Sequence, residues 1–271
     1  MSVTFSKAPL VEIVAELKWG SAQANIPQIQ AGIPILVQSP NQDEFFMRFG
    51  GEIYQKNFKK SERLIPSGFP IILHQVVYRY SKEKIAEGDS ALLYQIGAGV
   101  FSANATPPYH SWDEFSPIVR GGVEALLASR LVAEKESPFT CNLRYIDAFG
   151  EYFNQGMDIE TFAREVLGIS LVLPAPIAGV LQAGKKIKPH IQLQIPVDDN
   201  TNMYLLIAEA VVGGELSILL DCTVSKTNSI APNSDDIMKV FTESRQIIHT
   251  MFVSLTSKIH ALMEPFKEQG K

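Results

Sequence analysis

A long amphipathic segment near the C-terminus constrains the fold of this chain more than any other feature of its sequence. Across residues 235–263, apolar side chains recur at helical spacing and form one continuous stripe. An isolated helix gains little stability from propensity alone, so this stripe must pack against another element. The stripe consists of Ile237, Val240, Phe241, Ile248, Met251, Phe252, Leu255, Ile259 and Leu262.

The partner of this helix is expected to be an antiparallel sheet formed by the segments that precede it. Residues 191–197 alternate apolar and polar side chains, which is typical of a strand with one buried face. Asp158 is expected to cap a short helix, and Asn233 or Ser234 to cap the long one. The expected order is a strand at 139–152, a short helix at 158–168, strands at 191–197, 203–212 and 215–224, and the long helix at 235–263.

The first half of the chain predicts a similar order of elements, although its patterns are weaker. Ser111 is a suitable N-cap for a helix whose apolar stripe includes Phe115, Val119 and Val123. The glycine pair that follows Phe49 is expected to end a strand. The predicted elements are strands at 11–19, 45–49, 70–80 and 92–102, followed by the helix at 113–131.

These patterns predict an α+β protein with two similar halves, residues 1–136 and 137–271. Each half is expected to be an antiparallel sheet closed by its C-terminal helix, by analogy with helix-grip or SecB-like folds. The boundary is placed in the charged segment 134–138, which ends in a proline. The halves share an order of elements rather than a repeated sequence.

The most distinctive motif of the chain lies in its first predicted half, at the start of the helix expected at 113–131. Asn104, Tyr109, Trp112 and Phe115 form the pattern Asn-x4-Tyr-x2-Trp-x2-Phe around a Pro-Pro corner. The three aromatic residues have the spacing of one helix face, which predicts that Phe115 packs on the sheet. Tyr109 and Trp112 lie at the helix entry, where such a corner either pins a loop or lines a pocket.

This motif resembles one from a sporadically distributed family of uncharacterised bacterial proteins about 270 residues long. The family has no established activity to carry over, although such families often sit among mobile or antiviral-defence genes. In place of a second expected acidic residue, the chain has Cys222 beside Asp221, which puts any function of an acidic pair in doubt. The other marks of the resemblance are Ala8-Pro9-Leu10-Val11-Glu12, Leu143-Arg144-Tyr145-Ile146-Asp147, and a terminal helix carrying His249 and Phe252.

Several common functions find no support in the sequence. The net charge of −5 gives no general affinity for nucleic acid, and the basic clusters at 55–63 and 185–188 are interpreted as solvated loops. The chain has no Walker A sequence, no Gly-x-Ser-x-Gly and no set of metal ligands at ligand spacing, so no cofactor is expected. Cys141 and Cys222 are expected to be buried, reduced thiols. No signal peptide or bilayer-spanning segment is expected, which favours a cytoplasmic protein and no membrane partner.

The leading hypothesis is a non-enzymatic binding protein that recognises a peptide, a protein partner or an apolar small molecule. A homo-oligomer is compatible with the sequence. An enzyme with dispersed site residues is the first alternative, and a cluster of Arg144, Tyr145, Asp147 and His190 in one pocket would favour it. A nucleic-acid-associated defence component is the second alternative. The residues expected to contact a ligand or partner are Asn104, Tyr109, Trp112, Arg144 and Tyr145.

Trp112 is predicted to be mostly buried and to pin residues 106–111 onto the sheet. Replacement of Trp112 by Ala should then lower the free energy of unfolding by roughly 3–5 kcal/mol, the cost of removing a large buried aromatic side chain. A thermal melt of the wild type and the variant measures this loss. An unchanged melting temperature would contradict burial and favour a purely ligand-binding role for this side chain.

Overall fold

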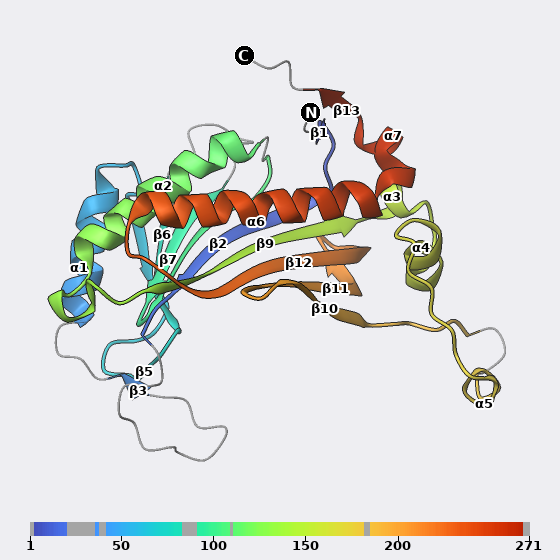
Figure 1. Ribbon diagram of the computed structural model, residues 1–271, viewed down its shortest axis with the longest axis horizontal. Helices are drawn as coiled ribbons and strands as arrows, with labels where there is room; N and C mark the ends of the chain where they lie inside the picture. Colours follow the sequence, from blue (N-terminus) through green and yellow to red (C-terminus); the bar gives the residue numbers. More distant parts are fainter. Residues whose placement is uncertain are drawn as a thin grey trace.

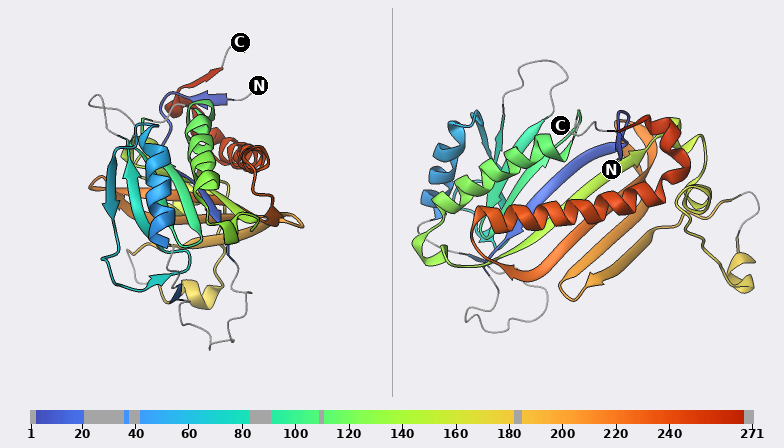
Figure 2. Two further views of the ribbon diagram at one scale, coloured as in Figure 1. Left: turned by 90° about the vertical axis from the view of Figure 1, so that its left-hand side faces the viewer. Right: turned by 45° about the horizontal axis from the view of Figure 1, so that its top comes forward.

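The computed structural model describes residues 3–20, 36–37, 42–82, 91–108, 111–181 and 185–267. It confirms an α+β protein built around a large antiparallel sheet. Within the described residues, nine strands form this sheet in the order β10-β11-β12-β9-β2-β8-β7-β6-β4. Helices α1, α2 and α6 lie across one face of the sheet, and α2 and α6 lie side by side (Figures 1 and 2).

The elements before the predicted boundary supply five strands of the large sheet and two of its helices. Short strands β3 and β5 pair separately from it. The elements are β1 (Val3–Phe5), β2 (Leu10–Lys18), β3 (Leu36–Val37), α1 (Gln42–Tyr54), β4 (Lys60–Arg63), β5 (Ile71–Ile72), β6 (Val76–Ser81), β7 (Leu92–Gly97), β8 (Val100–Ala105) and α2 (Trp112–Ser129).

The elements after the boundary supply the other four strands and the long helix α6. Strand β13 returns to pair with β1, so the ends of the described chain lie together (Figure 1). The elements are β9 (Phe139–Phe149), α3 (Glu151–Asn154), α4 (Ile159–Glu165), α5 (Ala175–Ala178), β10 (Ile191–Asp198), β11 (Thr201–Val212), β12 (Glu215–Ile230), α6 (Ser234–Leu255), α7 (His260–Met263) and β13 (Pro265–Lys267).

Strands β2 and β9 form the centre of the sheet and join its two sides. They run antiparallel, with Ile13 opposite Tyr145 and Leu17 opposite Cys141. On one side of this pair, β2 continues through β8, β7 and β6 to β4, and on the other, β9 continues through β12 and β11 to β10. Because β2 and β9 come from opposite sides of the predicted boundary, the sheet is continuous across it.

Helix α6 packs on β9, β12 and α2, and most of its apolar stripe belongs to the core. Its N-cap is Asn233, whose side-chain oxygen accepts a hydrogen bond from the backbone N–H of Asp236 at 2.8 Å. The helix ends at Leu255, earlier than the sequence pattern predicts. Thr256 follows the last helical residue, and its hydroxyl donates a hydrogen bond to the carbonyl of Phe252 at 2.7 Å. A 3₁₀ turn then connects α6 to α7.

The strand predicted at 45–49 is wrong, because these residues lie in helix α1. Phe45, Phe46 and Phe49 are buried on one face of that helix, at a spacing that fits a helix better than a strand. The helix continues through Gly50, where a Cβ atom would lie 3.2 Å from the ring of Tyr80. The hydroxyl of Tyr80 donates to the carbonyl of Phe46 at 3.0 Å, so this glycine permits a close contact rather than a turn.

The single strand predicted at 92–102 is also wrong, because the chain reverses within it. Strands β7 and β8 form a hairpin that turns at Ala98 and Gly99. Gly99 has φ of +71°, and a Cβ atom there would lie 2.5 Å from the carbonyl oxygen of Trp19. Only glycine fits this turn without displacing the backbone that carries Trp19.

The connection between α2 and β9 is held by a fully buried arginine. The Arg130 guanidinium donates to the carbonyls of Lys135 at 3.3 Å and Ser137 at 2.9 Å. It lies 4.5 Å from the ring centroid of Phe139 and 5.4 Å from that of Trp19, and its burial lowers its pKa to about 10. The segment 134–138 is therefore a packed connection whose carbonyls are tied to the end of α2.

Replacement of Arg130 by Ala should lower the free energy of unfolding by about 3 kcal/mol or more. The change leaves two carbonyls without their donor and removes the cation from two aromatic faces. Urea denaturation measures the loss. Arg120→Ala on the same helix is the matched control, because Arg120 is partly exposed and its one ion pair in the described part of the chain is with Asp235. Equal stability of the two variants would contradict this role for Arg130.

Candidate functional site

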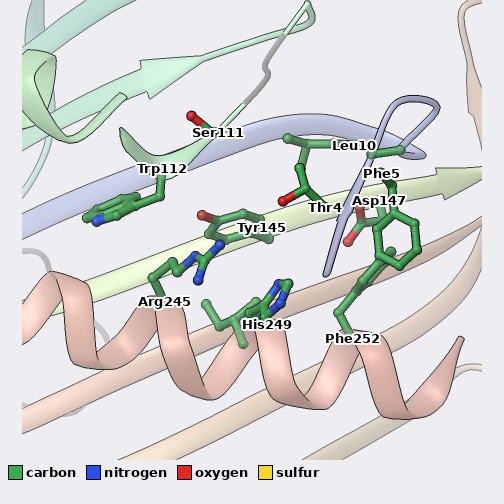
Figure 3. Close-up of a pocket in the computed structure, with 12 residues that line it drawn as sticks. Thr4, Phe5, Leu10, Ser111, Trp112, Tyr145, Asp147, Arg245, His249 and Phe252 are labelled. Carbon is green, nitrogen blue, oxygen red and sulfur yellow. The ribbon is translucent and has the colours of Figure 1, made fainter. Parts of the chain in front are cut away.

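A pocket lies between α6, β9, the N-terminal residues and the start of α2 (Figure 3). Its cavity volume is about 100 Å³. This exceeds the roughly 10–15 Å³ that one water requires, so the pocket has room for a small organic group. The residues that line it are Thr4, Phe5, Ala8, Leu10, Ser111, Trp112, Tyr145, Asp147, Arg245, Ile248, His249 and Phe252.

The ionisable side chains of the pocket come from two elements, β9 and α6, and the periodicity of each element puts its side chains on one face. Tyr145 and Asp147 are two residues apart on β9, so both lie on the sheet face that the helices cover. Arg245, His249 and Phe252 are four and three residues apart on α6, which puts them on one face of that helix. The α6 face lies over this part of β9 because the two elements pack together.

Aromatic side chains form much of the apolar wall. Phe5 meets Phe252 edge to face, with ring centroids 6.0 Å apart, and Trp112 meets Phe115 in the same way at 6.1 Å. The strand that carries Phe5 is held by its pairing with β13. Trp112 is 7% exposed, which confirms the prediction that it is mostly buried, and it also lines the pocket.

Asp147 is a buried carboxyl group without a hydrogen-bond donor among the described residues. Its exposed fraction is 5%. Burial, and secondarily the charge of Asp221, raise its pKa to about 8. The positive charge of Arg245 on α6 does not bring the pKa of Asp147 back to its ordinary value. The carboxyl is therefore predominantly protonated at neutral pH, and it presents an O–H donor to the pocket.

Arg245 is a half-buried cation that takes part in no hydrogen bond or ion pair of the described residues. Its guanidinium points from α6 toward Tyr145 and the interior of the pocket (Figure 3). The pKa of His249 is lowered, first by burial and then by the charge of Arg245. The imidazole is therefore predominantly neutral at pH 7, and Arg245 supplies the positive charge of this pocket.

The predicted contact residues fall on both faces of the sheet. Trp112 and Tyr145 line the pocket, whereas Asn104 and Arg144 lie on the opposite face, because residues that alternate along a strand point to opposite sides. Tyr109 lies outside the described residues. The sheet therefore brings only two of the five together in this pocket.

Asn104 belongs to a hydrogen-bonded row on the face without helices. Its amide donates to the Glu12 carboxylate at 2.8 Å, and its carbonyl oxygen accepts from the hydroxyl of Ser102 at 2.8 Å. Asn142 on β9 donates in the same way to Glu16 on β2. These contacts tie β8, β2 and β9 together, which gives Asn104 a structural role.

A second, larger depression on this opposite face includes Arg144. Its cavity volume is about 450 Å³. Arg144 donates to both carboxylate oxygens of Asp221, at 2.8 and 2.5 Å, and Glu16 pairs with Lys18 at 2.8 Å. Because the charged groups that line this depression are paired with one another, it offers a ligand less unsatisfied polarity than the pocket beside Trp112.

The cluster that would favour an enzyme forms only in part. Tyr145 and Asp147 share the pocket, but Arg144 points to the other face and His190 is exposed outside the pocket. Sequence reasoning missed Arg245 as a site residue. Its position on the stripe side of the long helix, one turn before His249, was the available signal.

Other chemistries find little support in the described residues. There, no three His, Cys, Asp or Glu side chains lie close enough to hold a metal ion. Both cysteines are buried free thiols, as predicted, and burial raises the pKa of each. Lysines of the two basic clusters pair with acids, among them Lys186 with Asp158 and Lys188 with Glu209. No helix in this part of the chain has the length and hydropathy needed to cross a bilayer.

Comparison of the chain with protein-family models, with curated protein sequences and with solved structures found no match. The candidate site is therefore argued from its own geometry.

Replacement of Asp147 by Asn should stabilise the protein, and the gain should grow as the pH rises. The pKa of this carboxyl is about 8 in the folded state and lower in the unfolded state. Its contribution to the stability of the fold is therefore complete below the unfolded-state pKa, and it is lost as the pH rises through 8. Asn carries no such cost, so the variant should gain about 2–4 kcal/mol over the wild type at pH 7. Urea denaturation at pH 4 to 8 measures the difference.

Asp158→Asn is a control with the opposite sign. Hydrogen bonds from Lys186 and from the Thr161 backbone lower the pKa of Asp158 to about 2. Its contribution is present above the unfolded pKa, so the control variant should be less stable than the wild type at neutral pH. A pH-independent difference between wild type and Asp147→Asn would contradict the buried, protonated state of Asp147.

Proposed function

We propose that this protein is a non-enzymatic binding protein whose site is the pocket between α6, β9 and the start of α2. The pocket receives a small molecule with an apolar body. The observation that carries this proposal is the presence of two ionisable groups, Asp147 and Arg245, that have no hydrogen-bond or ion-pair partner among the described residues and lie in a mostly apolar wall.

The energetic cost of Asp147 supports a functional role. A buried carboxyl without a donor lowers stability, and an apolar residue of similar volume would remove that cost. Groups whose pKa values are strongly shifted in a concave site occur preferentially at functional positions. A ligand that accepts a hydrogen bond from Asp147 would satisfy the group and recover part of the cost.

The size of the cavity supports a small ligand. Pockets for drug-sized molecules enclose roughly 300–1,000 Å³, whereas this cavity holds about 100 Å³. A nucleotide or flavin would not fit within it. A compact aromatic or aliphatic group matches the walls formed by Phe5, Trp112 and Phe252.

We also propose that the chain belongs to the sporadic bacterial family that its motifs resemble. The motifs that carry the resemblance are far apart in the sequence, and each supplies residues to this pocket. The motif at 8–12 supplies Leu10, the aromatic motif supplies Trp112, and the motif at 143–147 supplies Tyr145 and Asp147. The terminal helix supplies Phe252. This convergence supports a shared ligand-binding role. A part in bacterial defence rests on the resemblance alone.

We further propose that the two sides of the sheet are an internal duplication of a helix-grip or SecB-like unit. In each half of the chain, the first and the last strand that join the large sheet lie next to each other. These neighbours are β2 and β8 in the first half, and β9 and β12 in the second. Each half then continues into a long helix, α2 or α6. The similar connectivity supports two copies of one unit joined through β2 and β9.

An acid–base enzyme is the second candidate function. Asp147 has a pKa of about 8, near the value at which a general acid works best at neutral pH, and the neutral imidazole of His249 lies in the same pocket. Mass spectrometry of a bound compound after incubation separates the candidates. An unchanged compound supports binding alone, and a converted one supports catalysis.

A protein-partner role is favoured by a separate observation. The segment 171–181 carries exposed apolar side chains, among them Val172 at 90% and Val180 at 82% exposure, and it extends away from the sheet (Figure 1). Exposed apolar patches of this kind often mark contact surfaces. Light scattering of the wild type and of Val172→Asp tests whether this segment holds copies of the chain together.

Ligand binding should perturb the pocket and leave the opposite face of the sheet unchanged. In ¹H–¹⁵N NMR spectra, small aromatic and aliphatic compounds should shift the signals of Trp112, Tyr145 and Arg245, which surround the cavity, and not those of Asn104 or Arg144. Ala8 is exposed at the pocket edge, so Ala8→Trp should block the shifts at little cost in stability. Shifts at Arg144 in place of Tyr145 would move the site to the other face.

A further inference from the structure

We propose that the ligand of this pocket is a small carboxylic acid, with its carboxylate paired to Arg245 and its apolar body between the aromatic walls. This inference rests on the proposed function and adds the chemical class of the ligand. The geometry points to it through the charge of the pocket, the state of its other polar groups and the shape of its walls.

Arg245 is the only one of the chain's eight arginines without a hydrogen-bonding or ion-pair partner in the described residues, which include all eight. Each of the other seven has at least one such partner within the protein. Six pair with carboxylates and Arg130 donates to carbonyls. The six pairs are Arg48–Glu44, Arg63–Asp43, Arg79–Glu62, Arg120–Asp235, Arg144–Asp221 and Arg164–Glu160.

The unpaired guanidinium is partly removed from water and faces the cavity (Figure 3). A guanidinium presents two parallel N–H donors that match a carboxylate, and such pairs are stronger where water is partly excluded. A ligand carboxylate would therefore give Arg245 the ion-pair partner that six of the other arginines find in acidic side chains of the protein.

Among the described residues that line the pocket, none presents a negative charge to such a ligand at neutral pH. Burial raises the pKa of Asp147 to about 8 and lowers that of His249, so both side chains are predominantly uncharged at pH 7. The acidic residues of the first turn of α2, Asp113 and Glu114, are exposed and do not line the cavity. The charge of Arg245 would repel a cationic ligand.

The remaining surface is apolar on several sides. Phe5, Leu10 and Phe252 lie toward the Asp147 end, and Trp112 lies toward the α2 end (Figure 3). A second charged group on the ligand would be buried against these walls without a partner, which is unfavourable. The ligand class is therefore a monocarboxylate with a compact aromatic or aliphatic body.

Calorimetric titration with matched probes tests this inference. Phenylacetate and hexanoate carry the carboxylate, and phenylacetamide and hexanamide are their neutral counterparts. At pH 7 the acids should bind at least tenfold more tightly than the amides. Phenethylammonium, which has the opposite charge, should not bind.

Arg245→Gln is the variant that isolates the charge. It should weaken binding of the two acids about tenfold or more while leaving the amides unchanged. Arg120→Gln is the matched control, because it removes an exposed arginine outside the pocket. Thermal melts of both variants verify that they remain folded.

The outcomes separate this inference from the proposed function. Equal binding of acids and amides, blocked by Ala8→Trp, would overturn the carboxylate inference and leave a binding pocket in place. Absence of binding by every probe would overturn both. Tight binding of acids that Arg245→Gln does not weaken would assign the charge recognition to another group and contradict this role for Arg245.

Discussion

The antiparallel pairing of β2 with β9 is the interaction on which the rest of this structure depends. These strands lie at the centre of a nine-stranded sheet and join segments separated by more than a hundred residues of sequence. Their register puts Ile13 opposite Tyr145 and Leu10 opposite Asp147. Because the pairing aligns both sides of the sheet, α2 and α6 cover the same face and meet each other (Figure 2). The pocket forms where these helices, β9 and the N-terminal residues come together.

The two faces of the sheet have different physical characters, and this difference assigns the roles of neighbouring residues. On the face without helices, Arg144 and Asn104 donate hydrogen bonds to carboxylates of adjacent strands, and these bonds hold the strands together. On the covered face, Asp147 lies in a mostly apolar pocket, and Arg245 faces the same pocket; neither has a hydrogen-bond or ion-pair partner among the described residues. Polarity that is satisfied within the fold stabilises it, whereas unsatisfied polarity in a concave site costs stability and is available to a ligand.

Much of the fold could be predicted from the sequence where apolar residues recur at the spacing of a helix or of a strand. The stripe of α6 and the caps Ser111 and Asp158 correspond to the structure. The alternation at 191–197 does form a strand, β10, but it lies at the edge of the sheet and leaves Leu193 and Val197 exposed. The errors arose where tertiary contacts decide what a glycine does: Gly50 lies inside a helix against Tyr80, and Gly99 turns a hairpin beneath Trp19. The site was harder to predict, because its side chains come from four distant segments. An aspartate in the otherwise apolar face of β9 was the strongest signal, and nothing in the sequence tells that Arg245 lacks a partner.

We infer that the covered face of the sheet buries the Asp147 carboxyl group in its protonated form at neutral pH, without a hydrogen-bond donor among the described residues. The most direct measurement is the ¹³C NMR signal of the Asp147 carboxyl carbon as a function of pH, assigned by its loss in Asp147→Asn. The account predicts that this signal stays at the protonated position through pH 7 and titrates near pH 8. A titration near pH 4, as for an exposed aspartate, would contradict the account, because the group would then be ionised and solvated.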